Sequence, residues 1–160
     1  MERDVRIDTE EYGFKYRVCG IVVVEDKLLV QKAENNEFYF LPGGHVELGE
    51  DTRSTIIREM DEETKNEFRI ESLVVINENF FMHEEKSFHE LGFYYKLEPK
   101  KEIKTENYSR IEIDKGKSKK LTFEWIPINE LNDIDFRPKF LKEKIINNDF
   151  KQEHIITKEI

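Results

Sequence analysis

The chain has 160 residues, of which 38% are hydrophobic and 38% charged, and its 26 basic and 35 acidic side chains give a net charge of −9. This length suits one domain with a buried core, and the many Phe, Tyr, Ile, Leu and Val residues exclude a disordered chain. The acidic balance argues against duplex nucleic acid as a partner, because binding a phosphate backbone needs a basic surface.

A lone cysteine, Cys19, excludes an internal disulfide, and its apolar neighbours predict a buried, inert thiol. No charged-then-apolar signal sequence opens the chain, and no apolar stretch approaches the roughly 20 residues that span a bilayer. We therefore expect a cytoplasmic protein without a membrane partner.

The first third of the chain predicts strands. Residues 1–13 are polar and weakly patterned, which predicts a loose lead-in. Two β-branched runs, 16–24 and 27–32, predict a hairpin of well-buried strands joined by a tight turn. Residues 38–41 predict a short aromatic strand that ends at Pro42, because proline cannot continue a ladder and the two glycines after it permit unusual backbone angles.

A helix is predicted over residues 52–64. Asp51 is a good N-cap residue, and Ile56, Ile57 and Met60 form the stripe expected to face the core.

The second half predicts further strands and one more helix. Long strands are expected at 73–81 and 88–97, and another at 121–126. Residues 98–120 are rich in lysine and glutamate, which predicts a long, mobile hairpin arm or loop whose lysines form a solvated face. An amphipathic helix is predicted over 137–148.

The C-terminal helix is predicted from Pro138 at its start and an apolar stripe of Phe140, Leu141, Lys144 and Ile145. Residues 149–160 are expected to be a tail. The succession of strands, helix, strands and helix, without repeat or linker, predicts one domain over 1–160, an α/β sandwich with a mixed sheet.

Three glutamates of the first helix, Glu59, Glu62 and Glu63, recur at i, i+3 and i+4 and so share one face. Three carboxylates this close repel one another, which favours a divalent cation among them. Magnesium or manganese is the simplest such ion, and its usual companion in an enzyme is a phosphate. A solvated glutamate face paired with Arg58 or Lys65 is the alternative interpretation.

Gly44, Glu50 and the run 58–63 stand at the spacing G-x5-E-x7-R-E-U-x-E-E, where U is aliphatic and Met60 fills it. This pattern closely resembles the Nudix box. The solvated-face interpretation does not explain the double glycine that precedes Glu50. The resemblance implies an α/β/α sandwich with a central mixed sheet, and hydrolysis of a nucleoside diphosphate linked to another group by attack of water on phosphorus.

The end of the motif departs from the box, because Lys65 replaces its last glycine and Asn66 its closing aliphatic residue. That glycine lies where a left-handed residue commonly ends a helix. Asparagine tolerates this conformation better than most residues, so we expect the cap to move to Asn66, with Phe68 supplying the apolar contact.

The resemblance also implies the site. Its metal ligands are the backbone carbonyl of Gly43 and the carboxylates of Glu59, Glu62 and Glu63, and its cofactor is Mg²⁺, with Mn²⁺ as an alternative ion. The catalytic residues implied are Glu59, Arg58 and Glu62, with Glu59 as first choice to orient or deprotonate the water.

Arg58 is expected to hold the loop and helix together by pairing with Glu50 or Glu47, since a guanidinium suits bidentate contact with a carboxylate. For Glu50 a structural role and a place near the metal both remain open. In some relatives the base is a glutamate outside the box, and the candidates here are Glu90, Glu112 and Glu124.

Substrate specificity lies outside the box. Residues 78–81 with His89 and Glu90 resemble a pattern of a bacterial subset whose substrates are poorly assigned. On a strand Phe80 and Phe81 point to opposite faces, so one can stack on a base, although core packing of both is the alternative. The substrate-binding candidates are Phe80, His89 and Glu90.

A MutT-like nucleoside triphosphate pyrophosphohydrolase is our leading hypothesis. A proline often follows the box in ADP-ribose pyrophosphatases, and none occurs between Pro42 and Pro99. ADP-ribose, sugar nucleotides and dinucleoside polyphosphates stay open, as does a catalytically silent nucleotide-binding sensor on the same fold. The expected partner is a small nucleotide, and because many relatives dimerise, the resemblance allows a homodimer.

Overall fold

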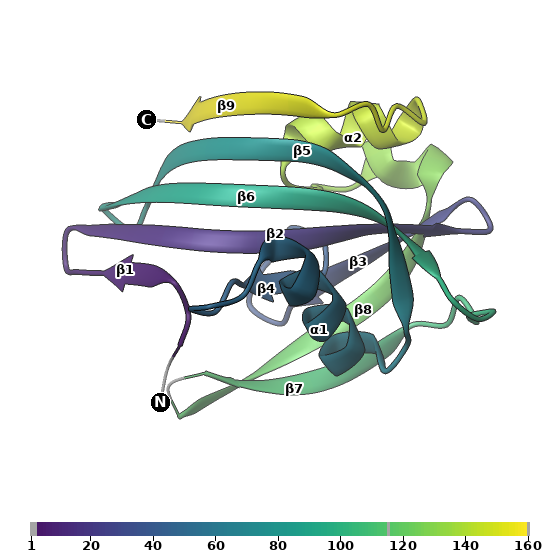
Figure 1. Cartoon of the computed structure of the whole chain (residues 1–160), viewed down its shortest axis with the longest axis horizontal. Coiled ribbons are helices and arrows are strands. Elements are labelled where there is room, and N and C mark those ends of the chain that lie inside the picture. Colours follow the sequence, from purple (N-terminus) through teal and green to yellow (C-terminus); the bar gives the residue numbers. More distant parts are fainter. Residues whose placement is uncertain (1–2, 115, 160) are drawn as a thin grey trace.

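The computed structural model describes residues 3–114 and 116–159, which form one mixed sheet with a helix against each face (Figure 1). The strands are β1 (Arg6–Asp8), β2 (Tyr12–Val24), β3 (Lys27–Ala33), β4 (Gly43–His45), β5 (Phe68–His83), β6 (Lys86–Pro99), β7 (Tyr108–Asp114), β8 (Lys117–Pro127) and β9 (Glu153–Glu159). The helices are α1 (Thr52–Thr64), the 3-10 helix η1 (Ile128–Asp133) and α2 (Lys139–Ile146).

The strands run in the order β7-β8-β3-β2-β6-β5-β9, and β1 and β4 also pair with β2. The pairs β2–β6 and β5–β9 are parallel and the remaining pairs antiparallel, which confirms the predicted mixed sheet. Within the described residues, no helix is both long and apolar enough to cross a membrane.

Successive side chains of β2 point to opposite faces of the sheet, so the core has one part on each face. Val18 and Val22 pack in a cluster with Ile56 and Met60 of α1. Ile21, between them, packs in a second cluster with Leu141 and Ile145 of α2. A helix on each face of one mixed sheet is the α/β/α sandwich that the resemblance implied.

Both ends of the described chain are more ordered than the sequence predicts. The prediction of a loose lead-in over 1–13 is wrong for β1, whose residues pair with Gly13 to Lys15 of β2. It is also wrong for the last residues of that segment, because β2 begins at Tyr12. The prediction of a tail over 149–160 is wrong, because β9 lies in this segment and pairs with the edge of β5. These short polar segments are ordered by pairing with long strands already in place, which local patterning does not reveal.

Several predicted elements shift. Residues 38–41 make only the isolated bridges of Phe40 with Gln31 and of Tyr39 with Phe136, and the strand here is β4. The two long strands extend to a two-residue turn, Glu84 and Glu85, whose φ angles of 49° and 64° suit a hairpin. The segment 98–120 contains the predicted hairpin arm, formed by β7 and the start of β8 after a loop over 100–107.

Helix α1 has the predicted bounds, and the Asp51 side chain accepts a hydrogen bond from the Ser54 backbone N–H. The predicted stripe is right for Ile56 and Met60 and wrong for Ile57, which is 37% exposed because it lies about 100° around the helix from Ile56. Helix α2 is shorter than predicted, and within its stripe Phe140 is half-buried while the other three residues are buried.

Candidate active site

Two consecutive glycines of β4 permit the close approach of loop, strand and helix on which the site is built. Gly43 pairs with Cys19 of β2 and Gly44 with Val18. A Cβ atom on Gly43 would lie 2.0 Å from the Val18 carbonyl oxygen, and one on Gly44 would lie 2.3 Å from the carboxylate of Glu59. Any side chain at either position would therefore move β4 or displace the Glu59 carboxylate from the β4 backbone.

Arg58 ties the loop to the helix. Its Nε and Nη2 donate to the two carboxylate oxygens of Glu50 at 2.8 and 2.9 Å, and its Nη1 donates to Glu59 Oε1 at 3.1 Å. The Arg58 hydrogen bonds lower the pKa of Glu50 to about 2, and Glu47 lies further from Arg58, at 3.9 Å. The predicted pairing of Arg58 with Glu50 is confirmed, and the occupied guanidinium fork leaves it a positioning residue.

Glu59, which is half-buried, and Glu63, which is buried, are carboxylates one helical turn apart. Burial raises the pKa of Glu59 to about 7. Burial, and then the charge of Glu59, raise the pKa of Glu63 to about 8. Within the described part of the chain, Glu63 Oε2 is buried without a hydrogen-bond partner. Arg58 therefore pairs with Glu59, whereas one oxygen of Glu63 is left without a direct partner.

The third predicted glutamate is arranged differently. Glu62 is 54% exposed, and its carboxylate lies 3.5 Å from Arg58 Nη1. Among residues 3–114 and 116–159, no three His, Cys, Asp or Glu side chains converge closely enough to hold a metal ion. The chemistry still fits a hard divalent cation, because buried carboxylate oxygens, one of them unpartnered, are what such an ion prefers.

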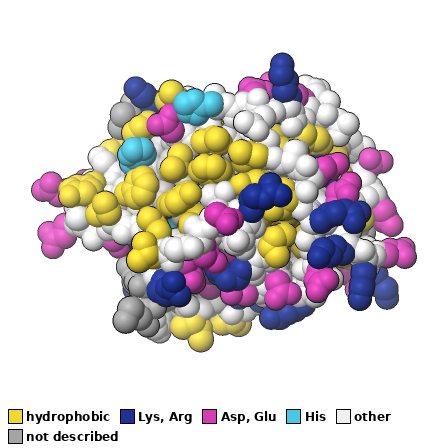
Figure 2. All heavy atoms as spheres, in the orientation of Figure 1, with side chains coloured by type: hydrophobic (Ala, Val, Ile, Leu, Met, Phe, Trp, Pro, Cys, Tyr) yellow, Lys and Arg dark blue, Asp and Glu magenta, His cyan; other side chains and the backbone are white. Residues whose placement is uncertain are grey.

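The candidates for substrate contact divide between the two faces of the sheet. Phe80 and His89 are cross-strand partners whose rings stack at 4.4 Å, and Phe14 meets His89 edge-on. Figure 2 shows hydrophobic side chains gathered over β2, β5 and β6 on this face. Glu90 follows His89 on the same strand and so points to the opposite face. Phe80 and His89 therefore lie together, and Glu90 does not lie with them.

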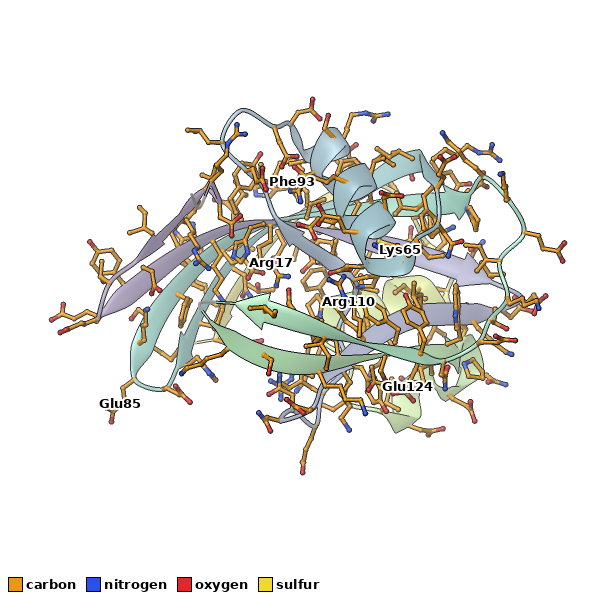
Figure 3. All side chains as sticks on the ribbon, turned by 90° about the horizontal axis from the view of Figure 1, so that it is seen from below. Arg17, Lys65, Glu85, Phe93, Arg110 and Glu124 are labelled. Carbon is orange, nitrogen blue, oxygen red and sulfur yellow. The ribbon has the colours of Figure 1, made fainter. Side chains whose placement is uncertain are left out.

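Of the candidate bases outside the motif, Glu112 acts on Glu63, because its charge contributes to the raised pKa of that carboxyl. Glu90 acts instead on the pKa of Arg17. Glu124 lies apart, on β8, away from α1 in Figure 3, and raises the pKa of Tyr39.

Cys19 is half-buried, and burial raises the pKa of its thiol to about 12. The thiol is therefore protonated at neutral pH, which agrees with the predicted inert role, although the side chain is less enclosed than expected.

A cleft of about 530 Å³ opens beside the C-terminal end of α1, and it is lined by Glu62, Glu63, Lys65, Tyr108, Arg110 and Trp125 among others. A larger hollow of about 710 Å³ on the other side of α1 is lined by Arg58 but by neither Glu59 nor Glu63. We place the candidate site at the smaller cleft, because the buried Glu63 and its neighbour Glu62 line it.

Two arginines at this site were missed by sequence reasoning. Arg17 lies on β2, where an arginine inside a β-branched run was the available signal. Arg110 lies on β7, within a lysine- and glutamate-rich segment that offered none.

The domain profile described as NUDIX domain matches residues 14–145. The chain belongs to the Nudix hydrolase family.

Relatives of known name or structure agree with this assignment. Over 60 residues the chain is 40% identical to an ADP-ribose pyrophosphatase of Methanocaldococcus jannaschii, and the match spans 36% of each protein, about a third of that relative's length. In fold it is similar to a mutator MutT protein from Bacillus halodurans (TM-score 0.61, 20% identity, 89% of each chain). It is also similar to a Nudix hydrolase from Nitrosomonas europaea (TM-score 0.58, 20% identity, 91% of this chain and 79% of that one). At these identities the two structures support the fold alone.

The Nudix box of this chain ends differently from the prediction. Lys65 itself adopts the left-handed conformation, with φ 59° and ψ 22°, and its backbone N–H donates to the Asp61 carbonyl. The cap therefore stays where the family has glycine, and the expected move to Asn66 is wrong. Asn66 instead bonds to Thr64, and Phe68 packs into the core as expected.

Proposed function

We propose that this Nudix protein hydrolyses a pyrophosphate bond in a nucleoside diphosphate linked to another moiety, with Mg²⁺ as cofactor and Mn²⁺ as an alternative ion. The observation that carries the proposal is the pair Glu59 and Glu63, in which the buried Glu63 carboxylate has one oxygen with no partner among the described residues. Two neighbouring carboxylates with raised pKa values, one of them incompletely paired, are suited to receive a cation and an anionic substrate.

The residues proposed to hold the ion are the carbonyl of Gly43 and the carboxylates of Glu59, Glu62 and Glu63. When bound, a divalent cation neutralises phosphate oxygens and lowers the pKa of a water molecule. Gly44 supports this assignment because its lack of a side chain leaves the Glu59 carboxylate against the β4 backbone.

Among the chain's own residues, Glu59 is our choice to orient or deprotonate the attacking water. Burial raises its pKa to about 7 in the protein without an ion, and a bound cation would lower that pKa and keep the carboxylate ionised. Arg58 keeps Glu59 in place through its hydrogen bond at 3.1 Å while Glu50 fixes the other edge of the guanidinium. Glu112, which acts electrostatically on Glu63, is the alternative base that the geometry favours over Glu124.

For the substrate, a nucleoside triphosphate remains our first candidate. ADP-ribose is the second, supported by the 60-residue likeness to an ADP-ribose pyrophosphatase. We further propose that residues 1–160 act as one domain. The partner would be a small nucleotide, with neither duplex nucleic acid nor membrane involved.

A panel of nucleoside triphosphates, ADP-ribose, sugar nucleotides and dinucleoside polyphosphates, assayed with Mg²⁺ and scored by product identity, tests the proposal. We expect Glu59→Gln to lower kcat by about 10²- to 10⁴-fold, as loss of a general base does, and Glu62→Gln also to lower it. The matched control is Asp61→Asn, an exposed acidic residue of α1, which should keep activity. Unchanged product release in both glutamate variants would contradict the hydrolase, and nucleotide binding without turnover would favour a sensor.

A further inference from the structure

Arg17 is a half-buried arginine whose guanidinium has unused hydrogen-bonding capacity. Its Nε is buried and finds no acceptor among the described residues. Leaving a charged donor buried and unpaired is costly, so an arginine kept in an apolar strand points to a ligand. Arg58 provides the contrast, because its guanidinium is occupied by Glu50 and Glu59.

The surroundings of Arg17 connect it to the candidate active site. Arg17 and Cys19 point to the same face of β2, and the charges of Glu59 and Glu63 act on the pKa of the Cys19 thiol. The Arg17 charge in turn lowers the pKa values of both glutamates. No ion pair within 4.0 Å joins Arg17 to either carboxylate in the described part of the chain. The guanidinium is near the carboxylates without being neutralised by direct contact.

Arg110 approaches the same carboxylate from another strand. It lines the cleft with Glu62 and Glu63, and its charge lowers the pKa of Glu63. Figure 3 shows Arg17 and Arg110 below α1, carried by β2 and β7. Glu63 thus lies within the electrostatic range of two arginines, one from the central strand β2 and one from the edge strand β7.

We propose that Arg17 and Arg110 bind the phosphate groups of the substrate beside Glu63. A guanidinium matches phosphate oxygens with two parallel hydrogen bonds, and a fully anionic diphosphate can accept from two arginines at once. Such a ligand gives the Arg17 Nε an acceptor. The inference rests on the proposed function, since it assigns the phosphate-binding residues of that same site.

The competing explanation is that both arginines only offset the negative charge of the glutamates. Binding of methylenediphosphonate, a pyrophosphate analogue that is not hydrolysed, separates the two, measured by titration calorimetry with and without Mg²⁺. We expect Arg17→Met and Arg110→Met each to weaken binding by about 10- to 100-fold, the range for a charge-assisted hydrogen bond, and Arg17→Lys to weaken it less. The matched control is Arg69→Met, which removes a 63% exposed arginine paired with Glu98 and should leave binding unchanged.

Mg²⁺ binding alone should be unchanged or tighter in both methionine variants, because a nearby positive charge is lost. Wild-type affinity for the analogue in both variants, together with a lower unfolding temperature, would overturn the proposal in favour of charge balance. Arg110 provides a second, half-buried position if Arg17→Met does not fold.

Kinetics keep this inference distinct from the proposed function. If the protein hydrolyses a nucleotide and the Arg17 and Arg110 variants keep the wild-type KM and analogue affinity, the arginine assignment is refuted and the hydrolase function is not. Arginine-dependent analogue binding by a chain that turns over no nucleotide would support it while refuting the hydrolase.

Discussion

Glu63 is a carboxylate whose burial opposes its ionisation, so its charge destabilises the metal-free fold. Its pKa of about 8 in the folded protein lies above the ordinary value of 4.5, so the folded state binds this proton more tightly than the unfolded chain. The contribution to stability is therefore full below about pH 4.5 and is lost as the pH rises through 8. We predict that Glu63→Gln raises the unfolding free energy above that of the wild type by about 1–3 kcal/mol at pH 8.5, with little difference at pH 4.

Urea denaturation in the presence of a chelator measures this difference. Glu62→Gln is the control, because the Glu62 side chain is largely exposed and its substitution should change the unfolding free energy less than that of Glu63. Added Mg²⁺ should stabilise the wild type and have less effect on Glu63→Gln, since the variant lacks a proposed ligand. A variant that is less stable than the wild type at pH 8.5 would show that Glu63 is compensated within the protein.

At the scale of elements, the end of α1 stores strain in Lys65. A left-handed conformation costs a residue with a Cβ atom roughly 1 kcal/mol and costs glycine almost nothing. We predict that Lys65→Gly stabilises the protein by about 0.5–1 kcal/mol, seen as a rise in the midpoint of thermal or urea unfolding. Asn66→Gly is the matched control, because Asn66 does not have a positive φ and its side chain bonds to the Thr64 carbonyl. Greater stabilisation by the control would place the cap at the wrong residue.

The same helix shows what a local pattern can predict. Its bounds followed from the Asp51 cap and the periodicity, both of which act within one turn. The residue that ends the helix could not be predicted in the same way. Whether Lys65 or Asn66 takes the left-handed conformation depends on how Phe68 enters the core. The neighbourhood of Glu59 and Glu63 was predictable for a similar local reason, since an i, i+4 spacing places both on one helix face, whereas Glu62 is largely exposed.

At the scale of the whole molecule, the sequence predicts the class of the fold but not the composition of the cleft. Arg17 and Arg110 lie 93 positions apart in the sequence, and the charges of both act on Glu63 only because the fold brings β2 and β7 near the same helix. The sequence could have predicted that His89 and Glu90 lie on opposite faces of the sheet, since neighbouring residues of a strand point in opposite directions. The pairing of β9 with β5 was not, because it depends on an edge that exists only after β5 and β6 have formed.

Strand β9 closes this edge and satisfies two buried polar groups. The Asn77 side chain, 1% exposed, donates to the Ile155 carbonyl and to Thr157 Oγ1. Lys144 of α2, 8% exposed, donates to the Lys151 carbonyl and to the Glu153 carboxylate. We predict that deleting residues 151–160 lowers the unfolding free energy by about 2–5 kcal/mol, because Asn77 then loses both acceptors and Lys144 keeps only the Asp149 carboxylate at 3.5 Å. Urea denaturation measures the loss, and amide hydrogen exchange should increase along β5.

The cause can be separated from a general loss of contacts by removing the polar groups themselves. In the shortened chain, Asn77→Val with Lys144→Met should recover part of the lost stability, because removing both partners costs less than leaving one buried and unpaired. In the full chain the same pair of substitutions should be destabilising, since the β9 groups would then lose their donors. A loss of the same size with and without these substitutions would assign the effect of β9 to its backbone pairing with β5 alone.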